Sequence, residues 1–335
     1  MAKIGIIGSG SWGMALSVLL YNNGHEVTVW SALPEEIREM QQTHRHHTLP
    51  DLVLPDHMVF TEDLEETMTG KDLLVTAVPS VYVRSTAKRM NPFCRYGQVV
   101  VNVAKGIEES SLMTLSEILE EELPIADVAV LSGPSHAEEV SKSLPTTCVA
   151  GATTRKTAEY IQSLFMSEVF RVYTSPDILG IELGGSLKNV IALAAGIADG
   201  LGYGDNTKAA LITRGIAEIS RLGTAMGGKI QTFGGLSGIG DLIVTCASMH
   251  SRNRRAGILM GQGKTMEEAT KEVKMVVEGI YSAKAALALS EKYEVSMPIV
   301  EQVNEVLFEG KSASEAVRDL MLRDKTIESS DIPWE

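Results

Sequence analysis

A lysine in the second half of the chain, Lys188, has the surroundings that most suggest chemistry. It interrupts a segment of mostly small and aliphatic side chains, residues 183–198. Helical spacing would place Gly184 and Gly185 on its face one turn earlier, so that no bulky side chain lies beside the ammonium. A buried lysine near a second cation has a lowered pKa, which suits proton transfer near neutral pH. The alternative is an ordinary helix lysine whose ammonium reaches water.

The same two glycines support a second prediction. A glycine inside a helix costs about 1 kcal/mol relative to alanine, so a pair of them needs a reason. We therefore expect backbone or a ligand to pack closely against the helix at Gly184 and Gly185.

Two polar segments further along the chain could complete such a site. Asp241 follows a glycine-dense loop and could either cap a helix, the commoner role, or orient an ammonium or a substrate hydroxyl. Ser251 begins a turn in which Arg252 and Asn253 stand where a helix favours acids. That mismatch suggests a bound anion such as phosphate, whereas the plainer interpretation is a basic turn in solvent.

A glycine loop near the N-terminus indicates a cofactor. Gly8, Gly10 and Gly13 follow an apolar strand, residues 4–7, and precede a helical run, residues 14–20. The first glycine allows a tight turn, the second lets backbone N–H groups approach a pyrophosphate, and the third lets helix and strand pack closely. This placement favours dinucleotide binding over a glycine turn that binds nothing.

Apolar strands separated by helical patterns continue through the first half of the chain. The predicted strands cover residues 4–7, 26–30, 72–78, 98–104, 127–131, 147–150 and 170–173. Such strands are typical of a parallel sheet that helices cover on both faces. Because ligands bind at the carboxyl ends of parallel strands, we expect Pro79, Lys105 and Ser135 to lie together near the nicotinamide end of the cofactor.

The second half of the chain has a mostly helical pattern up to about Leu322. Its first helix should begin at Ser175-Pro176-Asp177, with the serine as cap and the proline in the first position. We predict two domains, residues 1–175 for the dinucleotide and residues 176–335 for substrate binding and catalysis. Breaks in the helical pattern are expected at residues 200–206, 227–241 and 261–264, and a tail at residues 327–335.

Composition and charge narrow the class of protein. The 335 residues carry a formal net charge of −13, which argues against a general nucleic-acid surface but allows a small anionic substrate. Three widely separated cysteines without metal-ligand spacing indicate a reducing compartment. With no secretory signal pattern and no apolar run long enough to span a bilayer, we expect a cytoplasmic protein. We expect no metal, and we interpret His44-Arg45-His46-His47 as a surface loop.

A series of short motifs resembles the bacterial type of NAD(P)-dependent glycerol-3-phosphate dehydrogenase over essentially the whole chain. Each motif could occur by chance, but their order and spacing together are specific. They lie at residues 8–13, 77–80, 105–108, 132–139, 187–190, 200–211, 238–242, 251–254 and 277–279.

The resemblance implies an α/β fold with an N-terminal Rossmann-like, parallel-rich sheet and a C-terminal all-α domain. It implies reversible hydride transfer between NAD(P)H and dihydroxyacetone phosphate, giving sn-glycerol 3-phosphate, a precursor of glycerophospholipids. Lys188 would be the catalytic proton donor and acceptor at the C2 oxygen. The substrate-binding residues would be Lys105, Gly133, Ser135, Asp241, Ser251, Arg252 and Asn253. The cofactor-binding residues would be Gly8, Gly10, Ser11, Trp12, Gly13, Lys105, Ala137, Arg252, Val276 and Glu278.

Simple electrostatics agrees with this implied site. Lys105 and Lys188 beside one ketone would lower each other's pKa, and a charged lysine would polarise the carbonyl. Asp241 could hold a lysine in line, and Arg252 with Asn253 could bind the substrate phosphate.

The sequence departs from the family pattern at the cofactor. Family members often carry an arginine after the second strand for the 2′-phosphate of NADP, but here Trp30 is followed by Ser31. No acid stands at that strand end to bond the ribose 2′-hydroxyl of NAD. Because nearby Arg38 could still serve NADP, the choice between NAD and NADP stays open. His136 stands where a phenylalanine is usual and leaves the backbone motif intact.

Two other functions stay open at this point. A related β-hydroxyacid dehydrogenase would share the two-domain plan but bind a substrate carboxylate, whereas the turn at Ser251 favours phosphate. A nucleotide-sensing module would bind NAD(P) without chemistry, which leaves Lys105, Lys188 and Asp241 unexplained. The expected partners are a phosphorylated small molecule and a second copy of the chain in a homodimer, with no nucleic acid.

Overall fold

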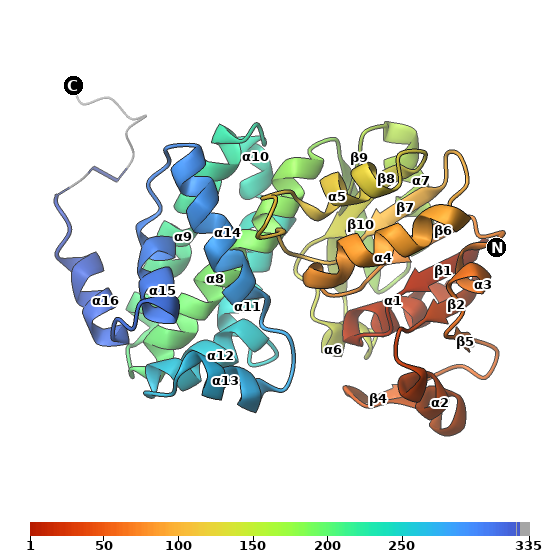
Figure 1. Cartoon of the computed structure of the whole chain (residues 1–335), viewed down its shortest axis with the longest axis horizontal. Helices are drawn as coiled ribbons and strands as arrows, with labels where there is room; N and C mark the ends of the chain where they lie inside the picture. Colours follow the sequence, from red (N-terminus) through yellow and green to blue (C-terminus); the bar gives the residue numbers. More distant parts are fainter. Residues whose placement is uncertain (326, 329–335) are drawn as a thin grey trace.

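The computed structural model describes residues 1–325 and 327–328, so most of the expected tail lies outside the described residues. One lobe is built on a sheet and contains the N-terminus, and a second lobe beside it is built of helices (Figure 1). The last helix, α16 (Ala313–Met321), lies on the side of the helical lobe that faces away from the sheet.

Eight strands form the central sheet in the order β10-β9-β8-β7-β6-β1-β2-β5. They are β1 (Lys3–Ile7), β2 (Glu26–Trp30), β5 (Val59–Thr61), β6 (Leu73–Thr76), β7 (Val99–Asn102), β8 (Asp127–Ser132), β9 (Thr146–Ala152) and β10 (Phe170–Ser175). The neighbouring strands β8, β7, β6, β1, β2 and β5 pair in parallel, as do β9 and β10. The prediction of a parallel-rich α/β sheet is confirmed.

The pairing of β8 with β9 is antiparallel, so the expectation of a parallel sheet is wrong at this position. Parallel neighbours need a long crossover, usually a helix, whereas the segment between β8 and β9 holds only the four-residue helix α6 (Ala137–Val140). The chain therefore returns beside β8 in the opposite direction.

A small hairpin, which the sequence did not predict, follows the second strand of the chain. It pairs β3 (Arg45–His46) with β4 (Leu49–Val53). The side chain of His46 is buried there, so the interpretation of residues 44–47 as a surface loop is wrong for His46. Among the described residues, no group of three or more histidine, cysteine or acidic side chains could hold a metal ion.

Helices cover both faces of the sheet. Leu73 and Leu74, neighbours in β6, join two different cores because alternate residues of a strand point to opposite faces. One core includes side chains of α1, α2 and α7, and the other includes side chains of α3, α4 and α5. These elements and two short 3-10 turns are α1 (Ser11–Asn22), α2 (Pro34–Thr43), α3 (Leu64–Met68), η1 (Ser80–Tyr82), α4 (Val83–Met90), η2 (Asn91–Phe93), α5 (Leu115–Glu122) and α7 (Arg155–Phe165).

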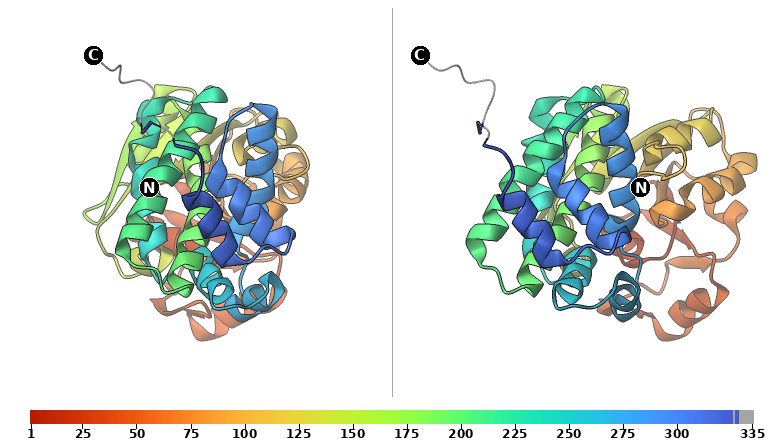
Figure 2. Two further views of the ribbon diagram at one scale, coloured as in Figure 1. Left: turned by 90° about the vertical axis from the view of Figure 1, so that its left-hand side faces the viewer. Right: turned by 60° about the vertical axis from the view of Figure 1, so that its left-hand side comes forward.

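The helical lobe is built around α8 (Ile178–Gly200), which is buried along most of its length. The other helices gather around it, as the turned views show (Figure 2). They are α9 (Asp205–Ala225), α10 (Ile230–Phe233), the π-helical turn η3 (Leu236–Gly240), α11 (Asp241–Ala247), α12 (Arg252–Gly261), α13 (Met266–Val273), α14 (Glu278–Lys292) and α15 (Pro298–Phe308). Together with α16 they match the mostly helical pattern that the sequence predicts.

The start of α8 differs from its prediction. Ser175 ends β10, and the cap is Asp177, whose Oδ1 accepts a hydrogen bond from the N–H of Gly180 at 3.0 Å. Pro176 therefore precedes the helix and does not occupy its first position. Asp177 also accepts a hydrogen bond from the hydroxyl of Thr232, so its carboxylate satisfies more donors than a serine hydroxyl could.

Two segments are long and apolar enough to cross a membrane by length and composition alone, Ile178–Gly200 and Ile230–Ala247. The expectation that no apolar segment is long enough to span a bilayer is therefore wrong by length and composition. In the most apolar 18-residue stretch of the first segment, 89% of the residues are buried inside the protein, which is the environment of a core helix.

Candidate active site

Lys188 lies in the middle of α8 and is buried, with 5% of its surface exposed, so the interpretation as a lysine reaching water is wrong. Its Nζ donates hydrogen bonds to Asp241 Oδ1 and, at 2.6 Å, to the hydroxyl of Thr245. The other oxygen of Asp241 lies 2.7 Å from Lys105 Nζ. One carboxylate thus joins a lysine of the helical lobe to a lysine from the loop that follows β7.

Burial and charge set the protonation of this group. Burial lowers the pKa of Lys188 to about 8, and the nearby ammonium of Lys105 acts in the same direction while Asp241 opposes it. Burial alone would raise the pKa of Asp241, but Lys105 and Lys188 outweigh it and hold that pKa below its usual value. The arrangement can therefore keep a carboxylate charged and let a lysine gain or lose a proton near neutral pH.

The two glycines one turn before Lys188 have the packing role that the sequence predicts. A Cβ on Gly184 would lie 2.5 Å from the carbonyl oxygen of Ser237 in η3. A Cβ on Gly185 would lie 3.5 Å from Cγ of Lys105, whose stem crosses the helix there. The close approach of these segments brings Lys105 and the start of α11 to Lys188, so the prediction of close-packed backbone is confirmed.

A cleft of about 370 Å³ lies at the carboxyl ends of the parallel strands, between the two lobes. Pro79, Lys105 and Ser135 all line it, so the prediction that these strand-end residues lie together is confirmed. Most of the other expected site residues line it too, namely Gly10, Ser11, Trp12, Ala137, Lys188, Ser251, Arg252, Asn253, Val276 and Glu278.

The remaining expected residues lie behind this lining. Gly8 has a φ of +119°, and a Cβ on Gly13 would lie 2.2 Å from the Gly8 carbonyl oxygen, so both shape the loop. Gly133 accepts a hydrogen bond from Lys105 Nζ at 3.0 Å through its carbonyl oxygen. Asp241 is buried beneath the two lysines.

The glycine loop fits a dinucleotide. Gly10 caps α1 without a side-chain hydrogen bond, and a Cβ there would meet nothing within 4 Å, so the helix N-terminus is open to an anion. The first turn of α1 contains no acid. Trp12 Nε1 is buried in the cleft wall and has no hydrogen-bond partner among the described residues. These residues could hold the pyrophosphate and neighbouring groups of a nicotinamide dinucleotide.

In the turn at Ser251, two side chains make hydrogen bonds within the protein and one is left to face the cleft. Ser251 caps α12 by accepting a hydrogen bond from the N–H of Arg254 at 3.2 Å, as the sequence predicts. Asn253 donates to Asn189 Oδ1 at 2.9 Å and accepts from the N–H of Gly279 at 2.8 Å, so its amide ties three helices together. Arg252 lines the cleft and has no side-chain hydrogen bond within the described part of the chain.

Several polar residues of the site were not expected from the sequence. Thr245 lies one helical turn after Asp241 in α11, a spacing that could have revealed it. Ser80 donates both its N–H and its hydroxyl to Glu278, which joins the sheet lobe to α14. Glu278 is partly buried, and burial raises its pKa, while Ser80 acts in the opposite direction. Glu36 also lines the cleft, next to the glycine loop.

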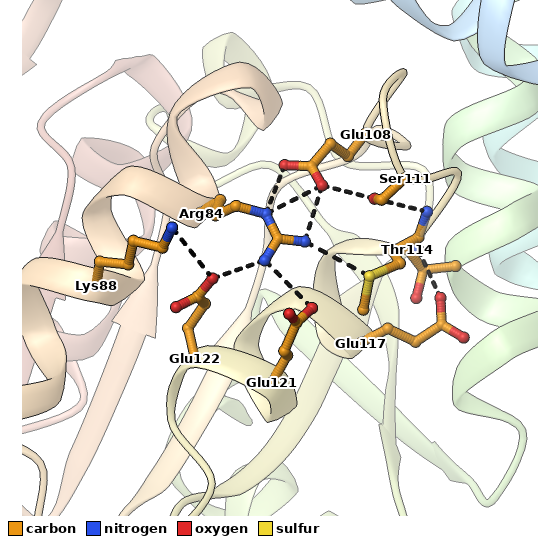
Figure 3. Close-up of polar contacts among 9 residues, drawn as sticks. Arg84, Lys88, Glu108, Ser111, Thr114, Glu117, Glu121 and Glu122 are labelled. Atoms are coloured by element: carbon orange, nitrogen blue, oxygen red, sulfur yellow. Dashed lines mark hydrogen bonds and ion pairs between the residues drawn. The ribbon is translucent and has the colours of Figure 1, made fainter.

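The loop that carries Lys105 is held by an ion-pair cluster outside the cleft (Figure 3). Arg84 of α4 donates from Nη2 to Glu108 at 2.8 Å and from Nη1 to Glu122 of α5 at 2.6 Å. On the inner side, the hydroxyl of Ser186 in α8 donates to the Gly106 carbonyl oxygen at 3.0 Å. Lys105 is therefore positioned by contacts on both sides of its loop.

A Rossmann-type sheet with an open glycine loop, facing a helical lobe that supplies a buried lysine and carboxylate, defines a nicotinamide-dependent dehydrogenase. Residues 3–158 match the N-terminal model of NAD-dependent glycerol-3-phosphate dehydrogenase, and residues 177–318 match the C-terminal model. The chain belongs to the glycerol-3-phosphate dehydrogenase family.

Relatives and a solved structure agree with this assignment. The chain is 68% identical, over its whole length and that of the relative, to a glycerol-3-phosphate dehydrogenase (NAD(P)+) of Agathobacter rectalis. It is 61% identical to the protein of the same name from Fusobacterium nucleatum, over 98% of this chain and 99% of the relative. The crystal structure of glycerol-3-phosphate dehydrogenase from Coxiella burnetii matches with a TM-score of 0.93 at 36% identity, covering 96% of this chain and 99% of that one.

Proposed function

We propose that this protein catalyses the reversible reduction of dihydroxyacetone phosphate to sn-glycerol 3-phosphate with NAD(P)H. The observation that carries the proposal is the buried contact of Lys188, Asp241 and Lys105 at a cleft that also contains an open glycine loop. The product is a precursor of glycerophospholipids, so the reaction would supply lipid synthesis.

Lys188 is proposed as the catalytic acid and base. The bound nicotinamide supplies or accepts the hydride at C2 of the substrate. In reduction, Nζ of Lys188 gives a proton to the C2 oxygen as that oxygen gains negative charge, and water later returns the proton to the lysine. In the reverse direction, the neutral amine removes the proton from the C2 hydroxyl.

Lys105 and Asp241 are proposed to prepare this proton transfer. Lys105 contacts both substrate and cofactor, and its positive charge polarises the ketone. Asp241 holds the two ammonium groups in place and offsets part of their repulsion, because its two oxygens bind one lysine each.

The phosphate and cofactor sites are proposed from the rest of the lining. Arg252 offers the substrate phosphate a guanidinium at the N-terminus of α12 that makes no hydrogen bond to any described residue. Gly133, Ser135, Ser251 and Asn253 complete the substrate site in this proposal. The proposed cofactor residues are Gly8, Gly10, Ser11, Trp12, Gly13, Lys105, Ala137, Arg252, Val276 and Glu278.

The assay follows oxidation of NADH and NADPH in parallel at 340 nm (the absorbance of the reduced nicotinamide) with dihydroxyacetone phosphate. We expect turnover with the wild type and a loss of kcat of at least about 100-fold in Lys188→Ala, the scale of general acid–base catalysis. Lys284→Ala is the matched control, since Lys284 is half-exposed, contacts Glu109 and the ring of Phe308, and does not line the cleft. Full activity of Lys188→Ala, or no oxidation of either cofactor, contradicts the proposal.

The related function of a β-hydroxyacid dehydrogenase is tested in the same assay. Replacing dihydroxyacetone phosphate with 3-carbon keto acids should abolish oxidation of the reduced cofactor, because Arg252 and the α12 N-terminus suit phosphate.

We further propose the two-domain division at residues 175 and 176, a cytoplasmic location and a homodimer formed through the helical lobe. Light scattering of the purified chain gives its molar mass directly, and a monomeric mass would contradict the dimer.

A further inference from the structure

A carboxylate lies at the end of the cleft beside β2. It comes from the following helix, because no acidic residue stands at the end of β2 itself. Glu36, in the first turn of α2, lines the cleft together with Gly10 and Ser11. Its Oε2 accepts hydrogen bonds from the hydroxyl of Ser9 at 2.6 Å and from that of Ser31 at 2.9 Å. Both serines are buried, so these bonds fix the carboxylate between the glycine loop and the end of β2.

That position is where a dinucleotide places its adenosine ribose. In a Rossmann sheet the pyrophosphate lies on the glycine loop, and the ribose hydroxyls lie beside the carboxyl end of the second strand. Ser9 belongs to that loop, and Ser31 directly follows β2. A carboxylate bonded to both serines therefore lies at the ribose.

The second oxygen of Glu36 is available to a ligand, since no described residue donates to Oε1. A ribose 2′-hydroxyl can donate to it in a short, charge-assisted hydrogen bond. A 2′-phosphate carries close to two negative charges at neutral pH and is mostly deprotonated, so it seldom has a proton to donate. The same carboxylate therefore repels it.

The nearby arginines do not offset this repulsion. The side chain of Arg38 is 62% exposed, lies 4.0 Å from the carboxylate of Glu35 and does not line the cleft. Arg45 donates to the Pro50 carbonyl oxygen at 3.2 Å. In the described hairpin the basic side chains that line the cleft are His46 and His47, which are not permanently charged.

We propose that Glu36 makes this enzyme selective for NAD(H) over NADP(H), because it accepts a hydrogen bond from the 2′-hydroxyl and repels a 2′-phosphate. The inference rests on the dehydrogenase function proposed above and specifies the cofactor of that same site. Glu36 is a cofactor-binding residue and takes no part in hydride or proton transfer.

The test measures binding and not turnover. Calorimetry on the full chain gives dissociation constants for NADH and NADPH, and for AMP and adenosine 2′,5′-bisphosphate, which isolate the 2′ position. We expect the wild type to bind NADH at least about tenfold more tightly than NADPH, and Glu36→Gln to weaken NADH about tenfold while the ratio approaches one. Glu35→Gln is the matched control, because Glu35 lies in the same helical turn but has 88% of its side chain exposed.

Several outcomes overturn the inference. One is wild-type protein that binds NADPH as tightly as NADH, a result that needs no variant and so holds even where Glu36→Gln fails to fold. Another is a folded Glu36→Gln protein whose NADH to NADPH ratio matches that of Glu35→Gln. Binding of neither dinucleotide overturns the proposed function itself, whereas equal binding of both overturns only the selectivity.

Discussion

Asp241 accepts hydrogen bonds from two lysines at once, and this arrangement sets the chemistry of single residues in the site. Lys188 and Asp241 are buried and Lys105 is partly so, which means that water screens their charges only weakly. Without Lys105, Asp241 would raise the pKa of Lys188 above its present value. Without Asp241, Lys105 would lower the pKa of Lys188 further. The trio leaves Lys188 with a pKa of about 8, where it can both give and take a proton.

The pH dependence follows from that value with opposite signs in the two directions. In the proposed mechanism reduction needs protonated Lys188, so kcat for dihydroxyacetone phosphate should fall as the pH rises through about 8. Oxidation of glycerol 3-phosphate needs the neutral amine, so its kcat should rise through the same pH. Initial rates between about pH 6 and pH 10 in both directions check this.

A variant separates the role of the carboxylate from that of the lysine. Asp241→Asn removes the group that raises the pKa of Lys188, so the inflection of both profiles should move to lower pH. An unchanged inflection, or one at higher pH, would contradict the assigned electrostatics.

At the scale of elements, glycines let α8 and α12 touch backbone to backbone. A Cβ on Gly196 would lie 2.1 Å from the Arg254 carbonyl oxygen, and one on Gly257 would lie 2.2 Å from that of Leu193. Protein interiors cannot absorb an added methyl at such distances without moving the helices apart. The contact therefore fixes the first turn of α12, which carries Arg252, against the helix that carries Lys188.

Gly257→Ala tests this contact. We expect a loss of about 1–3 kcal/mol in the free energy of unfolding, measured by urea denaturation, together with a higher KM for the phosphate substrate. Gly234→Ala is the control, since a Cβ there would lie at an ordinary 3.6 Å from the nearest atom. Equal stability of the two variants would show that the helices yield easily.

The elements also show what the sequence could predict. The apolar strands and the glycine loop follow local patterns, so their positions were predictable from the residues alone. The direction of β9 was not, because a buried strand has the same residue pattern whether it pairs parallel or antiparallel. The cap at Asp177 was missed because its strength comes from Thr232, 55 residues away.

The site shows the same limit. The family resemblance gives the lining residues, whereas the partners of Asp241 depend on how α8, α11 and the loop after β7 meet in space. Glu36 was missed because its carboxylate reaches the end of β2 only through the orientation of α2.

At the scale of the whole molecule, Glu182 connects the lobes. It lies in α8 and accepts hydrogen bonds from the N–H of Ser116 at 3.0 Å and from the Ser116 hydroxyl, at the start of α5. Asn102, at the end of β7, lies 3.5 Å away through its amide nitrogen. Burial raises the pKa of Glu182 to about 7, although Ser116 acts in the opposite direction.

This shift predicts how stability depends on pH. In the unfolded chain a glutamate loses its proton near pH 4.3, whereas folded Glu182 keeps it up to about 7. Its contribution is therefore fully present below about pH 4, and it is lost as the pH rises through about 7. Glu182→Gln cannot ionise, so its free energy of unfolding should be close to that of the wild type near pH 4 and should exceed it increasingly as the pH rises, by about 3 kcal/mol at pH 8.

Urea denaturation of both proteins at several pH values between about 4 and 8 measures this difference. The control is Glu35→Gln in α2, because the Glu35 side chain is 88% exposed and takes no part in the contacts of Glu182. A gap between wild type and Glu182→Gln that shrinks as the pH rises would contradict the assignment.

The helix α8 belongs to the cores of both lobes. Its first turns pack into the sheet, since Ile178 and Ile181 share a core with Val130 and Val149 of β8 and β9. Its later turns are the centre of the helical lobe. A helix packed into the cores of both lobes is held at each end, because separating it from either lobe would require that core to repack. We therefore expect Lys188, in the middle of this helix, to keep its place relative to both lobes.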